Sequence, residues 1–343
     1  MGFIMKDFLK NIAVFVIFAI LMAFAVEWIL RLLPDAADSR YHSIFAYREK
    51  SGGYYTLVPG KTAKVNGVLY SVNPEGFRDK SYPALPQKGY YRIIGIGDSV
   101  MFGLGLDIQD CFLKQMESNL NRMGLPFKVE ALDFGVSGIN SDAGIERFLS
   151  SGINFKPHHV IIQMLLDDFR LTHVSEETKN IGIIGMVKEF LKQHFFASYF
   201  MVKKSLKQYR IMKTLPESSS LDTYLTTIYK EQSEDFLFTK KRFVELNDVC
   251  KKNKSHLTIL IFPYLKTYEG KYKFRDYHDK WREFFDKNNI DYIDLIDYLK
   301  ESELEGYRLN PNDMMHPNKK ASQDIGTALS LEIGERIRNY RFK

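Results

Sequence analysis

The chain has 343 residues, of which 45% are hydrophobic and 14% aromatic, so it can bury a large core and is not a disordered protein. The net charge of +6 comes from 48 basic and 42 acidic residues. Because nucleic-acid binding needs a concentrated basic face rather than a mild excess, we expect no nucleic-acid partner. Two cysteines, Cys111 and Cys250, are too few for a disulfide framework or a metal cluster.

The N-terminus contains fifteen consecutive residues without a charge, IAVFVIFAILMAFAV at positions 12–26, preceded by Lys6 and Lys10. If the helix continues to residue 33, its length at about 1.5 Å per residue matches the ~30 Å hydrocarbon core of a bilayer. Pro34 then ends the helix. The sequence therefore predicts a single-pass transmembrane helix within residues 1–34.

A cleaved signal peptide is the alternative, because a basic start and a short apolar core precede the small-x-small sequence at residues 23–25. Apolar residues resume beyond that site in WILRLL, which favours an uncleaved anchor. Basic residues are nearly balanced on the two sides of the helix. We expect the short tail inside and the large domain on the extracytoplasmic side of the membrane.

The rest of the chain divides by pattern into an arm and a larger domain. Residues 35–89 hold short mixed segments with turn signals and predict an extended or β-rich arm. From residue 90 to 340, apolar runs of strand length alternate with amphipathic segments of helix length. The expected strands are residues 91–96, 128–134, 160–166, 257–262 and 292–295. The expected helices are residues 108–122, 143–150, 239–252, 280–287 and 319–337. This alternation predicts an α/β fold with a parallel sheet covered on both faces.

One segment, residues 170–238, separates two strands by more than the usual crossover length. It contains an aromatic and basic sequence, IIGMVKEFLKQHFFASYFMVKKSLKQYRIM. We expect a helical insertion packed on the sheet edge. A substrate lid and a membrane-resting surface are the alternatives.

The sequence GIGDSV, which follows the first strand of the domain, raises the question of what Ser99 does. A phosphate-binding turn is a poor fit, because Val100 occupies the last glycine position of G-x-G-x-x-G and no P-loop sequence is present. A nucleophilic serine needs a base within reach and a group that orients this base. Asp313 and His316, three residues apart in NPNDMMHPN after the last strand, are the candidates.

Four blocks in this order resemble the SGNH, or GDSL-type, hydrolase superfamily. They are GDSV with Ser99, FGVSGINS with Gly138, QMLLDDF with Asp167, and Asp313-x-x-His316. Upstream, VNPEGFRDKSYP at residues 72–83 resembles the approach segment of the membrane-anchored branch of this superfamily. The resemblance covers about residues 70–337. It implies a flavodoxin-like three-layer α/β/α sandwich and acyl-ester chemistry.

Carried over by position, the resemblance implies that Ser99 is the nucleophile, His316 the general base and Asp313 the group that orients the imidazole. The backbone amides of Ser99 and Gly138 would bind the oxyanion. The family has an asparagine where this chain has Asp167, and an ionised carboxylate cannot donate to an oxyanion. Three explanations stay open: Asp167 is protonated, it turns away while Asn140 supplies an amide, or activity is weak or lost.

The sequence thus predicts a membrane-anchored serine esterase that removes an acyl group from a glycan, lipid or small ester. Transfer of the acyl group to a sugar hydroxyl and a non-catalytic binding or scaffold protein of the same fold are the alternatives. We expect no metal and no cofactor, because the histidines have no metal-ligand spacing with acids. The sequence gives no indication of the oligomeric state, of the substrate or of its acyl length.

Overall fold

The computed structural model describes residues 2–30, 41, 43–48, 54–168, 225–226, 229 and 233–342. The chain divides into two compact units, residues 1–43 with 175–219, and residues 44–174 with 220–343. Most of the insertion expected at residues 170–238, including its basic and aromatic sequence, lies outside the described residues.

The first helix, α1 (Gly2–Leu30), contains a stretch that is long and apolar enough to cross a membrane. The 20 residues of Lys10–Ile29 have a mean hydropathy of 2.6. Large apolar side chains along the helix are exposed, including Phe15 at 71% and Leu21 at 62%. An apolar surface of this kind is costly in water and is typical of a membrane span or of a signal sequence.

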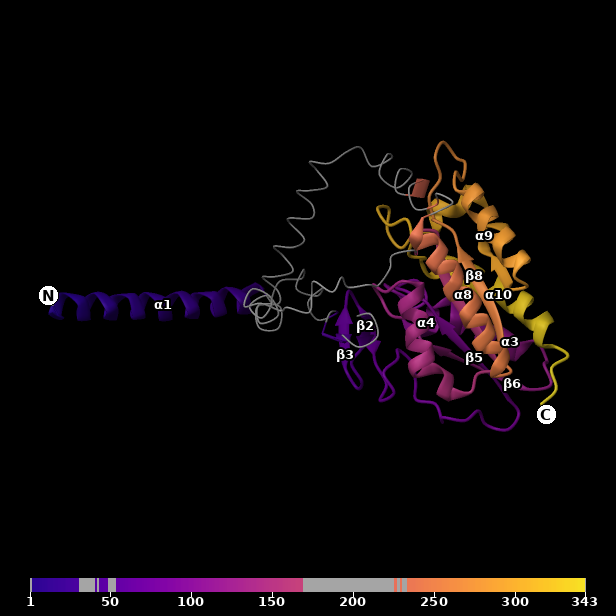
Figure 1. The fold of residues 1–343 in the computed structure, drawn as a ribbon, viewed down its shortest axis with the longest axis horizontal. Helices are drawn as coiled ribbons and strands as arrows, with labels where there is room; N and C mark the ends of the chain where they lie inside the picture. Colours follow the sequence, from indigo (N-terminus) through magenta and orange to yellow (C-terminus); the bar gives the residue numbers. More distant parts are fainter. Residues whose placement is uncertain are drawn as a thin grey trace. The chain divides into compact units, whose positions relative to one another are not determined.

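The second unit is built on a sheet of five parallel strands in the order β6-β5-β7-β8-β9 (Figure 1). The strands are β5 (Tyr90–Ile96), β6 (Lys128–Asp133), β7 (His159–Leu165), β8 (His256–Phe262) and β9 (Asp291–Asp294). Side chains on both faces are buried along β5, β7 and β8, which explains why these strands read as continuous apolar runs. The first strand lies between the second and the third, as in flavodoxin-like folds, and the predicted fold class is confirmed.

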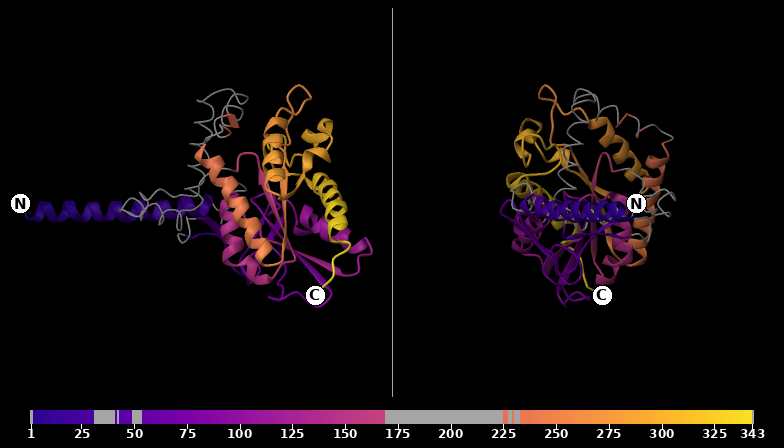
Figure 2. Two further views of the ribbon diagram at one scale, coloured as in Figure 1. Left: turned by 45° about the vertical axis from the view of Figure 1, so that its right-hand side comes forward. Right: turned by 90° about the vertical axis from the view of Figure 1, so that its left-hand side faces the viewer.

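Helices cover both faces of the sheet (Figure 2). They are α3 (Phe112–Arg122), α4 (Ser141–Ser150), α8 (Glu234–Lys252), α9 (Arg275–Lys287) and α10 (Lys319–Ile337). Helix α3 packs against α10, and α8 packs against α4 and, through Phe243 and Trp281, against α9. Short 3-10 helices lie at Ile108–Asp110, Gly152–Phe155, Leu295–Asp297 and Glu301–Tyr307. The three-layer arrangement follows from these contacts.

Two helices near the site start with asparagine caps. The side-chain oxygen of Asn140 accepts a 3.0 Å hydrogen bond from the Ala143 amide, and that of Asn318 accepts one of 3.0 Å from Ala321. Each cap satisfies an amide that would otherwise lack a partner in the first turn, and so fixes where α4 and α10 begin.

Two small antiparallel sheets precede the central sheet in the chain. One pairs β1 (Phe45–Arg48) with β2 (Tyr54–Leu57), and the other pairs β3 (Thr62–Val65) with β4 (Val68–Ser71). Arg147 of α4 donates to Thr56 Oγ1 at 3.0 Å and to the Gly76 carbonyl at 2.7 Å. This segment is therefore bonded directly to a helix of the central sandwich.

Arg78, which follows the second hairpin, is 1% exposed and holds the chain that comes after β5. Its guanidinium donates to the carbonyls of Phe102 and Gly103 at 2.7 and 2.8 Å, and also to that of Leu106. The same group lies over the rings of Tyr70 and Phe102, at 4.4 and 5.1 Å from their centres. The planar donor fork of an arginine suits several carbonyls at once, and a lysine would not replace it.

Candidate active site

The candidate site lies where β5, β6 and β7 end. Ser99 follows β5, Gly138 follows β6 and Asp167 follows β7. The carboxyl ends of parallel strands meet at one edge, and β5 lies between β6 and β7, so this is the point where the strand order reverses. Ligand sites of open α/β sheets form at such points.

Ser99 lies in a tight turn that the backbone closes on itself. The Phe102 amide donates to the Asp98 carbonyl at 3.0 Å, and the Leu104 amide donates to the Ser99 carbonyl at 3.0 Å. Asp98 Oδ1 accepts the Val100 amide at 2.8 Å, so the carboxylate stabilises the turn itself. These bonds fix the backbone on both sides of the serine.

The hydroxyl of Ser99 lies 2.7 Å from Nε2 of His316, which is 217 residues later in the chain. The other ring nitrogen, Nδ1, lies 2.8 Å from Oδ2 of Asp313. A carboxylate only accepts, so Nδ1 carries the proton and Nε2 is left to accept the serine proton. The structure thus brings together three side chains that the sequence singled out.

The loop that carries Asp313 and His316 is tied to its surroundings by backbone hydrogen bonds. The Leu309 amide donates to the His316 carbonyl at 2.8 Å, and the Leu265 amide, in the loop after β8, donates to the Met314 carbonyl at 2.7 Å. The loop that carries the imidazole is therefore held in place by hydrogen bonds to its surroundings.

Asp313 accepts three hydrogen bonds in all. Its Oδ1 accepts the backbone amides of Met315 and His316, both at 3.0 Å, and its Oδ2 accepts the imidazole. Burial raises the pKa of Asp313, but these hydrogen bonds outweigh it and the net pKa lies below the usual value. The carboxylate is consequently the stable form beside the imidazole.

The turn after β6 runs beside the turn that carries Ser99. The Val136 amide donates to the Gly97 carbonyl at 3.0 Å, and a Cβ on Gly135 would lie 2.4 Å from the Phe102 nitrogen. Only glycine allows this approach.

Gly138 has a φ of +83°, and a Cβ there would meet nothing within 4 Å. Among the described residues, neither the Ser99 nor the Gly138 amide has an acceptor, so both are available to a ligand oxygen.

Three carboxyl groups lie near the end of β7. Burial, and then the negative charge of Asp167, raise the pKa of Asp98 to about 6 against the opposing effects of the Val100 amide and His316. Burial and the charges of Asp98 and Asp167 also raise the pKa of Asp168 well above its usual value. Asp168 accepts the Ser141 hydroxyl at 2.8 Å and the Leu165 amide at 3.4 Å. Asp168 therefore links the end of β7 to the start of α4.

Asp167 itself is partly exposed at this edge. The side-chain oxygen of Asn140, the residue considered as a substitute amide donor, is committed to capping α4 through Ala143. That bond restricts the directions in which the Asn140 amide nitrogen can point.

Sequence reasoning did not identify Arg78 or Leu265 as neighbours of the site. Arg78 stands within the VNPEGFRDKSYP segment, but nothing in that pattern marks it as buried. Leu265 comes three residues after β8, and this position at the carboxyl end of a strand was the available signal.

The environment of Asp133, at the end of β6, predicts that this residue makes the free energy of unfolding depend on pH. Its Oδ1 accepts the Gly135 amide at 2.8 Å, whereas its buried Oδ2 has no partner among the described residues. Burial raises its pKa to about 7, so the native state holds a proton that the unfolded state releases near pH 4. The contribution of this protonated carboxyl to the free energy of unfolding is fully present below pH 4. It is lost as the pH rises to about 7.

Asp133→Asn should therefore raise the thermal unfolding midpoint by a few degrees at pH 8 and change it little at pH 4, because the amide cannot ionise. Thermal unfolding across this pH range measures the effect, with Asp286→Asn as a surface control. An equal change at both pH values would contradict it.

Among the described residues, no three His, Cys, Asp or Glu side chains are grouped so as to hold a metal ion. Comparison with protein-family models gives no match, and no curated protein matches the chain.

Solved structures do match. A lipase/acylhydrolase from Enterococcus faecalis is 14% identical, with 74% of this chain and 100% of that chain covered and a TM-score of 0.43. A catalytic mutant of Axe2, an acetylxylan esterase from Geobacillus stearothermophilus, is 14% identical, with 71% and 94% covered and a TM-score of 0.42. A putative lipolytic protein of the G-D-S-L family from Desulfitobacterium hafniense DCB-2 is 14% identical, with 70% and 98% covered and a TM-score of 0.40. At this similarity no residue role transfers from them to this chain.

Proposed function

We propose that this protein is an ester hydrolase of the SGNH superfamily that works through an acyl-enzyme on Ser99. The observation that carries the proposal is the unbroken set of contacts from Ser99 Oγ to His316 Nε2 and from His316 Nδ1 to Asp313 Oδ2, at 2.7 and 2.8 Å. Nucleophile, base and orienting carboxylate in this geometry are what serine acyl transfer requires.

In the proposed reaction, Ser99 Oγ attacks the ester carbonyl while His316 Nε2 takes the hydroxyl proton. Asp313 holds the imidazole in the required tautomer and stabilises the imidazolium. The amides of Ser99 and Gly138 receive the developing oxyanion. The imidazolium then protonates the leaving alcohol, and water, activated by the same imidazole, releases the acyl group.

The same proposal places the enzyme at a membrane. Residues 1–34 form a single-pass anchor, supported by the exposed apolar surface of α1. Residues 35–89 form the β-containing arm, and residues 90–340 form the hydrolase domain on the extracytoplasmic side, with its insertion at about residues 170–238. Its substrate is an acyl ester of a glycan, a lipid or a small alcohol.

Reaction with a fluorophosphonate probe tests the proposal. The full-length chain in detergent micelles should be labelled on Ser99, because the probe reacts with serines activated by a neighbouring base. Labelling should disappear in Ser99→Ala and persist in Ser150→Ala, whose hydroxyl donates to the Arg147 carbonyl at 3.0 Å. Folded wild-type protein that takes up no probe would instead favour a non-catalytic protein of this fold.

A further inference from the structure

The general base of the proposed reaction lies in a loop, residues 309–317, that connects the 3-10 helix Glu301–Tyr307 to α10. We call this segment the base loop. Its two ends run antiparallel beside each other and form a short stem, in which the Leu309 amide donates to the His316 carbonyl at 2.8 Å. His316 is therefore part of the stem, and the position of its imidazole depends on how firmly the two ends are joined.

Asn318, the first residue after the base loop, bonds across the stem with both its main chain and its side chain. Its backbone amide donates to the Tyr307 carbonyl at 2.8 Å. Its side-chain Nδ2 donates to the carbonyls of Gly306 and Arg308, at 2.8 and 3.2 Å. The side-chain amide thus binds the residues on either side of Tyr307 and joins the two ends of the loop.

The residue type at this position supports a task beyond capping α10. The cap uses only Oδ1 of Asn318, which accepts the Ala321 amide at 3.0 Å. Serine, threonine or aspartate would also cap the helix, because a cap needs only an acceptor. The two donated bonds need an NH₂ group beside that acceptor, and among the residues favoured at caps only asparagine carries both.

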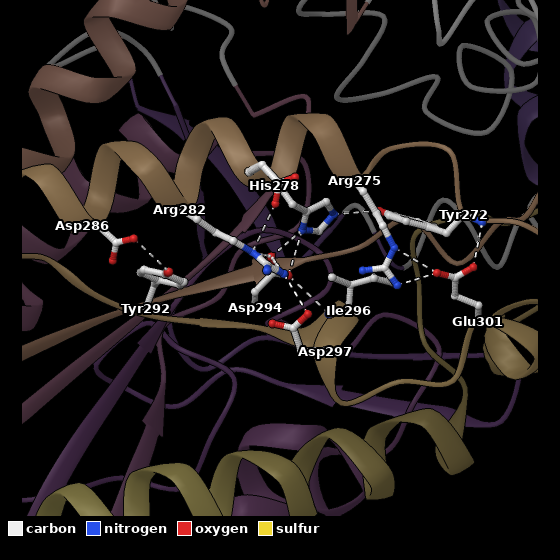
Figure 3. A network of polar contacts seen from close by, with 11 residues as sticks. Tyr272, Arg275, His278, Arg282, Asp286, Tyr292, Asp294, Ile296, Asp297 and Glu301 are labelled. Carbon is white, nitrogen blue, oxygen red and sulfur yellow. Dashed lines mark hydrogen bonds and ion pairs between the residues drawn. The ribbon is translucent and has the colours of Figure 1, made fainter.

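The 3-10 helix that Asn318 binds is itself anchored at both ends. Figure 3 shows Glu301, at its start, accepting from Arg275 Nε at 3.0 Å and from the Tyr272 amide at 3.2 Å. At its other end, the Tyr307 hydroxyl donates to Asp324 of α10 at 2.7 Å. Asn318 therefore ties the base loop to an element that is held in place.

We propose that Asn318 is a positioning residue that joins the ends of the base loop and so holds the imidazole of His316 at hydrogen-bonding distance from Ser99. The inference rests on the function proposed above. Ser99 Oγ and His316 Nε2 are 2.7 Å apart, a distance that suits proton transfer. A displacement of about 1 Å can lower a rate by about 100-fold, so a loosened stem is felt at the reaction. Asn318 acts through the loop and not by contact with the ester.

Asn318→Asp tests the inference, because it keeps the oxygen that caps α10 and removes the NH₂ group. In the full-length chain in detergent micelles, it should lower kcat for a chromogenic short-chain ester by about 10-fold and keep KM within about twofold, since proton transfer is impaired and ester binding is not. A carboxylate facing two carbonyls adds repulsion, so Asn318→Ser, which caps without a charge, is the second variant and should show the same pattern. Wild-type kcat in a folded variant would overturn the inference.

Asn121 is the matched control, because it makes the same set of bonds far from the catalytic ends of the strands. Its Nδ2 donates to the carbonyls of Glu117 and Val129 at 2.9 and 2.8 Å, and its Oδ1 accepts the Val129 amide at 3.0 Å, near the start of β6. Asn121→Asp and Asn121→Ser should lower the thermal unfolding midpoint by a few degrees, as the Asn318 variants do, and keep kcat within about twofold. A loss of kcat as large as that of the Asn318 variants would assign both losses to stability and overturn the inference.

Hydrogen–deuterium exchange of the same variants gives a readout that needs no activity. Amides of residues 306–318 should exchange about 10-fold faster in Asn318→Asp than in the wild type, and at the wild-type rate in Asn121→Asp. Unchanged exchange in Asn318→Asp would refute the inference whatever the activity. Faster exchange, in a protein whose wild type neither hydrolyses esters nor reacts with the phosphonate, would support the hold of Asn318 on the loop and refute the proposed function.

Discussion

Replacing Ser99 with alanine should lower kcat for ester hydrolysis by about 10⁴- to 10⁶-fold, because the proposed acyl-enzyme can no longer form. The hydroxyl is partly exposed and contacts His316 at 2.7 Å, so its loss leaves no large cavity and the unfolding midpoint should stay within a few degrees of wild type. Initial rates with a chromogenic short-chain ester and thermal unfolding measure the two quantities.

His316→Ala should cause a loss of similar size, and the Ser99→Ala/His316→Ala double variant should lose no more than either single variant. Groups that act as one unit are not additive, since the base is useful only when it has the serine proton to accept. His256→Gln, at the start of β8, is the control and should keep rates within about twofold. Multiplicative losses in the double variant would show that the two residues act separately.

Asp313→Asn should lower kcat by about 10³- to 10⁴-fold without unfolding the loop. An asparagine oxygen can still accept hydrogen bonds from the Met315 and His316 amides, whose nitrogens lie 3.0 Å from Asp313 Oδ1. The asparagine NH₂ group then faces His316 Nδ1 and forces the ring proton onto Nε2. In that tautomer the imidazole cannot accept the serine proton.

The tautomer explanation for Asp313→Asn has its own check. Fluorophosphonate labelling of Ser99 should slow in parallel with turnover, because both depend on the same proton transfer. Asp286→Asn, which removes the negative charge beside the Tyr292 hydroxyl, should leave the labelling rate unchanged. A variant that is labelled at the wild-type rate but turns over slowly would place the role of Asp313 after acylation.

The elements of the sandwich could be predicted from the sequence because strands buried on both faces give unmistakable apolar runs. Helix α10 begins and ends where expected, whereas α9 begins at Arg275, five residues before the expected start. Its first turn contains His278, which the fold buries completely between Tyr272 and Asp294. The boundary was missed because tertiary contacts, not periodicity, make that histidine a core residue.

The site could be predicted to the extent that it depends on chain order. Ser99, Asp313 and His316 follow strands that must end at one edge, so their meeting follows from topology. The bonds that join the ends of the base loop could not be predicted, because an asparagine before a helix indicates no more than a cap. The bonds from Asn318 to the Gly306 and Arg308 carbonyls depend on the folded course of the chain.

The bonds made by Arg78 and Arg147 determine where the chain can be shortened. A recombinant domain that begins at β5, where the hydrolase pattern starts, would lack the guanidinium that binds the carbonyls of Phe102 and Gly103. It would also lack Thr56 and Gly76, two hydrogen-bond partners of the buried Arg147 guanidinium. A shortened version without the apolar helix α1 should therefore keep the chain from residue 44 onwards, so that the turn of Ser99 stays braced.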